Sequence, residues 1–288
     1  MQPTVATALR FALERLKSLP TPRSDAEELL SRLLGVSRTA LRMQGGRLLS
    51  PEESDRWEVW LRRRAAHEPV QYITGRAAFR DLDLAVDPSV LIPRPETEGL
   101  VETVLEVLRA ERERWPVARV LDLGTGSGAI ALALASEWPS AVVTATDASV
   151  AVLRVARANA AALALESRMR FLEGDWFGPL GPGERFQVVV SNPPYVATRE
   201  WDALPQDVRA FEPRQALLSG PDGLDATRAI VRAAPGHLVT DGLLALELAE
   251  DRAREVAGWF GGNPGWGAVE LRSDLAGQPR HLLARRRG

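Results

Sequence analysis

The run VLDLGTGSG at residues 120–128 decides the fold of this chain. A strand-forming segment ends at Leu123, a glycine-rich turn follows, and the helix-forming run AIALAL occupies residues 129–134. Glycines between a strand and a helix let the backbone bend tightly and let a ligand approach the N–H groups that begin the helix. The run therefore predicts a ligand-binding turn in an α/β domain, with contacts from Gly124, Thr125, Gly126, Ser127 and Gly128.

Short apolar runs alternate with helical patterns around this turn. Strands are expected at residues 119–123, 141–146, 169–172, 186–191, 243–248, 268–271 and 280–284, and helices at residues 96–114, 129–136, 149–162, 226–234 and 251–259. Such alternation is typical of a mainly parallel sheet that is covered by helices on both faces.

The first part of the chain instead predicts short helices. Leucines at positions 9, 13 and 16 recur at helical spacing, SDAE at residues 24–27 predicts a capping box that opens a helix to Leu34, and SPEE at residues 50–53 predicts the start of a helix that ends at Ala66. Alternating apolar and acidic residues then predict a hairpin. We expect a helical domain over residues 1–70, a hairpin linker over residues 71–90 and the α/β domain over residues 91–288.

Composition excludes several kinds of chemistry. The 288 residues include no cysteine, which excludes thiolate nucleophiles and cysteine zinc sites, and His67, His237 and His281 lack metal-ligand spacing. The 36 basic and 38 acidic residues leave a net charge of −2, which argues against a protein whose main task is to hold a phosphate backbone. No signal peptide or membrane-length apolar run is evident, so we expect a cytoplasmic protein that binds no membrane.

Acidic and aromatic side chains narrow the ligand of the glycine turn. Asp147 ends the second strand about 20 residues after the last glycine, where a carboxylate can accept hydrogen bonds from ribose hydroxyls. The G-x-G-x-G spacing, with Asp122 and Asp147 close by, suits a cationic nucleoside better than a diphosphate. S-adenosylmethionine is such a ligand. After the third strand, Trp176 can stack on its adenine and Asp175 can accept from its amine, although a plain rim or core role for Trp176 is an equal alternative.

The fourth strand ends in the loop NPPY at residues 192–195. Two prolines remove two N–H donors, so the loop presents two acceptors, the Asn192 side-chain oxygen and the Pro193 carbonyl. Two fixed acceptors can orient a planar NH₂ group toward an electrophilic methyl, while Tyr195 covers its face. The loop therefore indicates methyl transfer to an amide or aromatic amino nitrogen, which depends on positioning and charge placement and uses no metal.

These segments together resemble the HemK/PrmC-type glutamine methyltransferases, which modify peptide chain release factors. The resemblance spans roughly residues 70 to 285 and also includes IPRPETE at residues 92–98, FEP at 211–213 and DGL at 222–224. One departure is Ala249, where the family usually has glycine after Leu-Glu-x.

The resemblance implies a Rossmann-like, seven-stranded class I methyltransferase domain, preceded by the helical domain and the hairpin. It implies that the side-chain amide nitrogen (N5) of glutamine in the Gly-Gly-Gln motif of class 1 release factors receives the methyl group, leaving S-adenosylhomocysteine. By this analogy Asn192 lies between cofactor and substrate and acts in catalysis with Pro193 and Tyr195, while Pro194 and Glu96 help to bind the substrate.

Two other functions remain open from the sequence. The same NPPY chemistry serves enzymes that methylate adenine or guanine in DNA or RNA, which usually carry a basic target-reading region. Here residues 1–85 carry a net charge of only +3, and we interpret the arginines at positions 62–64 as the solvated side of a helix. The second alternative is a partner-binding protein without catalysis, which has no evident use for the paired acceptors of the NPPY loop.

Overall fold

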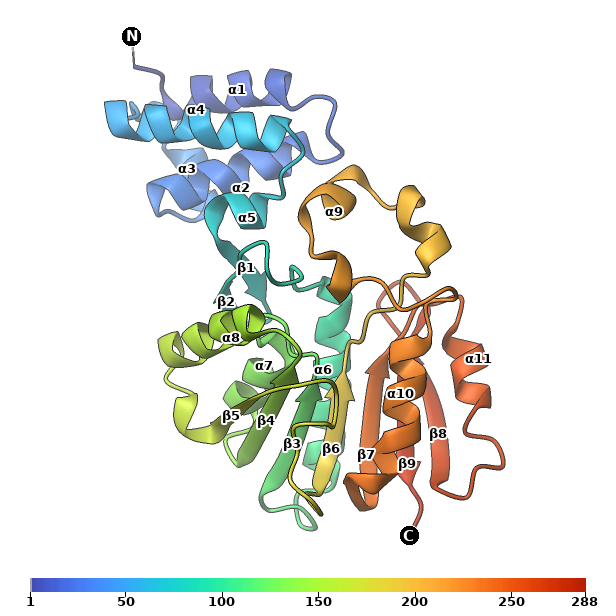
Figure 1. Cartoon of the computed structure of the whole chain (residues 1–288). Coiled ribbons are helices and arrows are strands. Elements are labelled where there is room, and N and C mark those ends of the chain that lie inside the picture. Colours follow the sequence, from blue (N-terminus) through green and yellow to red (C-terminus); the bar gives the residue numbers. More distant parts are fainter. Residues whose placement is uncertain (1) are drawn as a thin grey trace. The chain divides into compact units, whose positions relative to one another are not determined.

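The structure is a computed structural model that describes residues 2–288 (Figure 1). It divides into two units: a helical unit, which comprises the residues up to Arg76 together with Pro205–Phe211, and a sheet unit, which comprises Ala77–Leu204 and Glu212–Gly288. No helix within residues 2–288 is long and apolar enough to cross a membrane.

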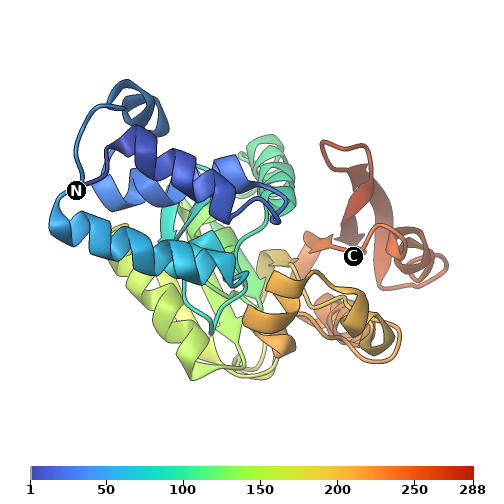
Figure 2. The same cartoon turned by 90° about the horizontal axis from the view of Figure 1, so that it is seen from above.

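The helical unit packs leucines and a tryptophan between short helices that lie side by side (Figures 1 and 2). Its helices are α1 (Val5–Arg15), α2 (Pro22–Leu34), α3 (Arg38–Met43), α4 (Pro51–Ala65), α5 (Val70–Thr74) and α9 (Gln206–Phe211). The predicted start of α4 is confirmed, and it forms a capping box: the Ser50 hydroxyl accepts from the Glu53 N–H at 3.1 Å, and the Glu53 carboxylate accepts from the Ser50 N–H at 2.8 Å.

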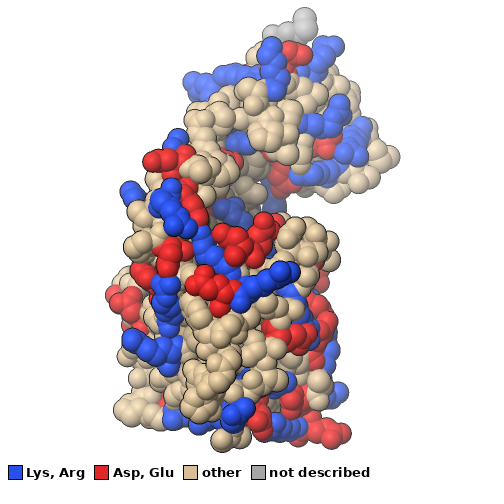
Figure 3. Space-filling model, turned by 90° about the vertical axis from the view of Figure 1, so that its right-hand side faces the viewer, with Lys and Arg blue, Asp and Glu red and all other residues tan. Residues whose placement is uncertain are grey.

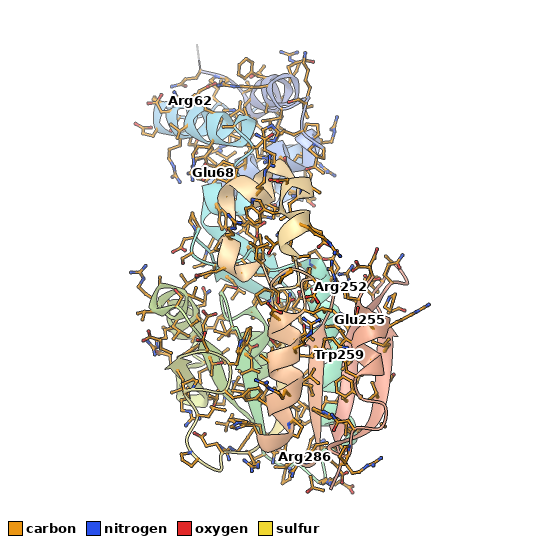
Figure 4. The ribbon with its side chains drawn as sticks, turned by 45° about the vertical axis from the view of Figure 1, so that its right-hand side comes forward. Arg62, Glu68, Arg252, Glu255, Trp259 and Arg286 are labelled. Atoms are coloured by element: carbon orange, nitrogen blue, oxygen red, sulfur yellow. The ribbon has the colours of Figure 1, made fainter. Side chains whose placement is uncertain are left out.

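Two expectations for this unit are wrong. Residues 24–27 do not cap a helix, because α2 already begins at Pro22, a residue that suits the first helical position. The arginines at positions 62–64 are not all solvated: Arg62 is exposed (Figure 4), but Arg64 is buried and donates to Asp25 at 2.7 Å. A buried arginine needs such a partner, and only the folding of α2 against α4 supplies it.

The hairpin is shorter than predicted. Its strands are β1 (Arg76–Phe79) and β2 (Leu82–Ala85), and residues 70–74, which we expected to belong to the hairpin from position 71 onward, form the helix α5. Gly75, with φ of 71°, ends α5 and lets the chain turn into β1.

The sheet unit contains a seven-stranded sheet in the order β5-β4-β3-β6-β7-β9-β8 (Figure 1). Strands β3 to β7 are parallel, and β9 runs antiparallel to β7 and β8. The bounds are β3 (Ala118–Leu123), β4 (Ala141–Asp147), β5 (Met169–Glu173), β6 (Phe186–Ser191), β7 (Leu238–Glu247), β8 (Trp266–Ser273) and β9 (Pro279–Arg286). The predicted mainly parallel sheet is confirmed, and strand order reverses at β3, where open α/β sheets bind ligands.

Alternate residues of the strands enter two cores, one on each face of the sheet. Val120 of β3 belongs to the core under α6 and α7, whereas Leu121 belongs to the core under α10 and α11. The helices of this unit are α6 (Pro95–Ala110), α7 (Ala129–Glu137), α8 (Val150–Ala162), α10 (Asp225–Ala233) and α11 (Ala253–Gly258), with short 3₁₀ turns at Glu166–Arg168, Thr198–Ala203, Arg214–Ala216 and Ala234–Gly236. Both faces are therefore covered, as the apolar strands require.

Candidate active site

A cavity of about 320 Å³ opens at the carboxyl ends of the parallel strands. The size is within the range of small-molecule sites. Its lining comes from the turns that follow β3, β4, β5 and β6 and from two segments farther away in sequence: Ser89, Val90, Leu91, Gly124, Gly126, Asp147, Ala148, Val152, Gly174, Asp175, Trp176, Asn192, Pro194, Gln215 and Ala216. The four sequence motifs singled out above therefore converge on one cavity.

The glycine turn forms the floor of this cavity. Gly124, Gly126 and Gly128 have φ of 68°, 57° and 86°, in the left-handed region that side chains disfavour. A Cβ built on Gly126 would meet no atom within 4 Å, because this glycine faces open space, whereas one on Gly128 would collide with Leu132 at 2.9 Å. Glycine is therefore needed at these two positions for different reasons. Gly126 leaves room for a ligand, and Gly128 lets α7 begin.

Not every residue of the turn reaches the cavity. Thr125 is buried and its hydroxyl donates to Asp122 at 2.7 Å, and the Ser127 carbonyl accepts from Asn159 at 2.9 Å. Asn159 also exchanges two hydrogen bonds with the backbone of Ala85. Thr125, Ser127 and Gly128 therefore hold the shape of the turn, and Gly124 and Gly126 supply its lining.

The two acids predicted near the turn lie in different environments. Asp147 lines the cavity, and its two carboxylate oxygens accept from the Gly126 and Ser149 N–H groups, each at 3.1 Å. Asp122 is fully buried beneath the turn, and burial raises its pKa to about 7, against the lowering effect of the Thr125 hydrogen bond. Asp147 is therefore the acid that can contact a ribose.

An aromatic wall follows β5. Trp176 and Asp175 line the cavity, and the indole lies 3.6 Å from where a Cβ of Gly124 would be. The Thr146 hydroxyl donates to the Trp176 carbonyl at 3.2 Å and helps to hold Trp176 at its unusual φ of 46°. The ring is therefore kept where a planar base can stack on it.

The NPPY loop contributes unequally to the cavity. Asn192 and Pro194 line it, whereas Pro193 is buried and Tyr195 lies outside the lining. Arg252, at the carboxyl end of the sheet (Figure 4), donates to the Tyr195 carbonyl at 3.0 Å, and Gly223 approaches so closely that a Cβ there would lie 2.4 Å from the same oxygen. Burial raises the pKa of Tyr195 to about 12, so its hydroxyl stays protonated.

The segment at residues 92–98 is held beside this loop by groups that the sequence did not single out for the site. The Glu212 carboxylate is buried and accepts from Arg94 at 2.5 Å and from the Ile92 N–H at 3.4 Å. Glu96 itself is exposed on the first turn of α6 and does not line the cavity. Its neighbour Thr97 is buried and reaches Asn192.

Several lining residues were not among the predicted site residues. Gln215 and Ala216 belong to a 3₁₀ turn, and residues 89–91 belong to the loop between β2 and α6. Their types are not specific to any chemistry, and only the folded chain brings them to the cavity. Ala249, the departure noted above, does not have a positive φ, so the backbone at this position does not require glycine.

The residues present fit S-adenosylmethionine. Gly126 leaves a cradle that a side chain would fill, Asp147 offers carboxylate oxygens at its edge, and Trp176 offers an aromatic face. The carboxylate of Asp147 at this edge repels a diphosphate and attracts a cation. A parallel sheet whose strand order reverses at a glycine turn, with these side chains, defines a class I S-adenosylmethionine-dependent methyltransferase.

Comparison with known proteins identifies the family. Residues 7–75 match the PrmC N-terminal domain, and residues 101–208 match the methyltransferase small domain. The release factor glutamine methyltransferase of Moorella thermoacetica is 43% identical over 99% of this chain and 99% of its own, and that of Cereibacter sphaeroides is 43% identical over 97% of this chain and 98% of its own. The chain belongs to the release factor glutamine methyltransferase family.

Solved structures with lower identity show the same fold. The 16S rRNA N2 G1207 methyltransferase of Thermus thermophilus, in complex with AdoMet and guanosine, has a TM-score of 0.51 and 22% identity and covers 74% of this chain and 50% of its own. A methyltransferase of Pyrococcus furiosus has a TM-score of 0.50 and 21% identity and covers 73% of this chain and 91% of its own. The predicted Rossmann-like class I methyltransferase fold is confirmed.

Proposed function

We propose that this chain transfers the methyl group of S-adenosylmethionine to the side-chain amide nitrogen (N5) of the glutamine in the Gly-Gly-Gln motif of class 1 release factors. The observation that carries the proposal is the position of Asn192, a carboxamide on the wall of the cavity whose floor is Gly126 and whose edge is Asp147. An acceptor at this place can meet an amide NH₂ beside a bound sulfonium.

In this proposal the chain acts by orientation. Asp147 binds the ribose, Trp176 and Asp175 border the adenine, and Gly126 leaves the space between them. The Asn192 oxygen and the Pro193 carbonyl accept the two N–H groups of the substrate amide, Pro194 borders that amide in the cavity, and Tyr195 and Glu96 contact the substrate outside the cavity lining.

S-adenosylmethionine supplies, when bound, a methyl group made electrophilic by the attached sulfonium. The amide nitrogen forms a bond to the methyl carbon as the carbon–sulfur bond breaks, and the nitrogen then releases one proton to water, so S-adenosylhomocysteine leaves without the sulfonium charge. The two acceptors stabilise the N–H groups as positive charge develops on the nitrogen, which is where oriented dipoles lower the barrier. The proposed reaction uses no metal.

The proposed partner is a protein and not a nucleic acid. The relatives named above carry the name release factor glutamine methyltransferase, and basic and acidic side chains are interspersed on the face shown in Figure 3. A net charge of −2 also gives little attraction to a phosphate backbone. Because release factors act on ribosomes, we place the reaction in the cytoplasm.

Mass spectrometry tests the substrate. Incubation of the chain with S-adenosylmethionine and a full-length release factor is expected to add about 14 Da, the mass of CH₂, to the peptide that contains Gly-Gly-Gln. Fragmentation should place the gain on the glutamine, and a release factor with that glutamine replaced by alanine is the control. Methyl label in RNA or DNA, with none in the release factor, would refute the proposal and favour base methylation.

We propose further that the helical unit recognises the release factor away from its glutamine. Large exposed apolar side chains among residues 2–288 are concentrated there, since four of the eight, Phe11, Met43, Leu48 and Val59, lie in this smaller unit. We assign contact with the release factor to these four side chains, because apolar side chains of a folded surface gain free energy when a partner protein buries them.

Substitution of two of these residues tests that role. Phe11→Ser combined with Met43→Ser is expected to raise KM for a full-length release factor about tenfold, because two apolar contacts are lost. Methylation of a short Gly-Gly-Gln peptide should not change. Val142→Ser with Leu275→Ser, two exposed apolar residues of the sheet unit, is the matched control. An unchanged KM of the Phe11→Ser, Met43→Ser variant for the full-length release factor would exclude these two side chains from recognition of the release factor.

A further inference from the structure

The side-chain amide of Asn192 has two ends of nearly equal size, and the proposed reaction needs one of them. If the carbonyl oxygen faces the substrate, it accepts an N–H of the glutamine amide. If the amide is turned by 180°, its NH₂ group meets the NH₂ group of the substrate, and two donors face each other. The inference below rests on the proposed function, because it concerns which groups turn the carbonyl oxygen of Asn192, and not its NH₂ group, toward the substrate.

The structure shows a partner for the Asn192 NH₂ group. Its Nδ2 donates to the Thr97 Oγ1 at 3.1 Å, and Thr97, in the first turn of α6, is only 4% exposed. Asn192 also lines the cavity. Thr97 thus engages the nitrogen of the amide, and the oxygen is the end that is left for a substrate amide in the cavity.

Thr97 alone does not select this orientation. A hydroxyl is both a donor and an acceptor, so it can accept from the Asn192 NH₂ or, after an amide flip, donate to the Asn192 oxygen. The two arrangements have similar energies unless another group takes the Thr97 proton. The orientation of the amide is therefore decided by the next partner of Thr97.

Glu247 is that next partner. Ser191 pairs with Leu246 in the parallel register of β6 and β7, so the following residues, Asn192 and Glu247, are neighbours on the sheet face that α6 covers. Glu247 is 1% exposed, its Oε2 has no hydrogen-bond partner in the described part of the chain, and the nearby Thr97 hydroxyl lowers its pKa. An ionised carboxylate only accepts, so Thr97 must donate to Glu247 and can then only accept from Asn192.

The first turn of α6 is held in place by a second contact. His281 pairs with Glu247 across β9 and β7, and its Nε2 lies 3.1 Å from the Glu96 carbonyl. A Cβ on Gly99 would lie 2.6 Å from the His281 ring, so this glycine lets α6 approach the sheet closely. Burial lowers the pKa of His281, and the neutral ring can donate to the carbonyl. These contacts hold the first turn of α6, which carries Thr97, against the sheet beside Asn192.

We propose that Thr97 and Glu247 are positioning residues that hold the Asn192 carboxamide with its oxygen toward the substrate amide. Neither residue lines the cavity, so both act through Asn192. In this arrangement the Asn192 NH₂ group donates to the Thr97 hydroxyl, and the Thr97 hydroxyl donates to the Glu247 carboxylate.

The proposal makes the orientation of Asn192 depend on the charge of Glu247. Burial raises the pKa of Glu247 to about 7, although hydrogen bonding to Thr97 lowers it. As the pH falls through 7, Glu247 becomes protonated, can donate to Thr97, and no longer forbids the flipped amide. Several charged or titratable groups surround Glu247. They are Arg94 before α6, Glu96 within α6, Tyr195 after β6, and Arg280 and His281 on β9.

A pair of substitutions at Thr97 tests the hydroxyl. Thr97→Val keeps the shape and removes the hydroxyl, and we expect kcat to fall about 10- to 100-fold at pH 8, because a mispositioned amide acts on the transition state. Thr97→Ser keeps the hydroxyl and should stay within about threefold of the wild type. The affinity for S-adenosylmethionine and the melting temperature check that the cavity and the fold persist. Equal losses in both variants, or no loss in Thr97→Val, would overturn the proposal.

Glu247→Gln tests the carboxylate. Glutamine does not titrate and, like protonated Glu247, can donate to Thr97. This variant should therefore show at pH 8 the lowered kcat that the wild type shows at pH 6 with saturating substrates, and its kcat should not fall further between pH 8 and pH 6. If kcat of Glu247→Gln falls between pH 8 and pH 6 as much as kcat of the wild type does, Glu247 does not have the proposed role.

A measurement without substrate separates this proposal from the proposed function. In the nitrogen-15 NMR spectrum of the full chain, the side-chain NH₂ signal of Asn192, assigned with Asn192→Ala, should shift in Thr97→Val and stay in place in Thr97→Ser. If the wild type fails to methylate a release factor while this pattern appears, the proposed substrate is wrong and the positioning stands. If methylation occurs and the signal is the same in all variants, the positioning is wrong.

Discussion

Replacing Asn192 by alanine is expected to lower kcat about 100- to 1,000-fold while the affinity for S-adenosylmethionine stays within a few fold. Asn192 and Pro194 are the residues of the NPPY loop that line the cavity, and the amide nitrogen of Asn192 donates to Thr97 at 3.1 Å. Alanine removes one of the two acceptors for the substrate amide, and the loss applies mainly to the transition state, in which the nitrogen gains positive charge.

Rates at saturating substrate concentrations measure kcat, and calorimetric titration measures the affinity for S-adenosylmethionine separately. The matched control is Asn263→Ala, which removes an exposed asparagine from a turn of the sheet unit, where its side-chain oxygen accepts from the Gly265 N–H at 3.0 Å. That variant should turn over like the wild type. Wild-type turnover by Asn192→Ala would contradict the orientation of the substrate by this side chain.

Replacing Gly126 by valine is expected to weaken binding of S-adenosylmethionine at least 100-fold, or about 2.7 kcal/mol. The φ of Gly126 is 57°, where a β-branched residue is strained, and its Cβ would point into space that no other atom occupies. The valine side chain would therefore fill the cradle, and the N–H that donates to Asp147 at 3.1 Å would be disturbed as well. Backbone strain at residue 126 and obstruction of the cradle by the valine side chain both weaken the binding of S-adenosylmethionine.

Gly262→Val separates these two causes. Gly262 has φ of 74° and equally open surroundings, but it lies in a turn of the sheet unit away from the cavity. This control carries the backbone strain without obstruction of the site, so it should lose stability and keep its cofactor affinity. Calorimetric titration of both variants measures the difference, and tight binding by Gly126→Val would show that the glycine turn does not hold the cofactor.

The local sequence was sufficient for the elements that carry the site. Strand, glycine turn and helix at residues 118–137 follow from apolar residues at strand spacing, three glycines and an alanine-rich run, and the structure confirms each. The position of Asn192 directly after β6 follows in the same way. Because the carboxyl ends of parallel strands lie at one edge of the sheet, residues that follow different strands were expected to meet.

Errors arose where neighbouring residues in sequence did not decide the structure. Residues 24–27 have the composition of a capping box, but Pro22 begins the helix earlier and Asp25 becomes the partner of the buried Arg64. Residues 70–74 have apolar side chains that suit a strand as well as a helix, and packing against the helical core selects the helix α5. Short apolar segments leave such choices to tertiary contacts.

The sequence by itself determined the fold class, the place of the cavity and the residues that line its floor, because spacing along the chain is sufficient to put glycines, Asp147 and Asn192 at strand ends. Only the tertiary structure decided which way Asn192 is held. Thr97 lies 95 residues before Asn192, and Glu247 lies on another strand. A hydrogen bond depends on the distance and direction between two groups, and neither is encoded in any local pattern, so the partners of Asn192 appear only when β6, β7 and α6 are folded together.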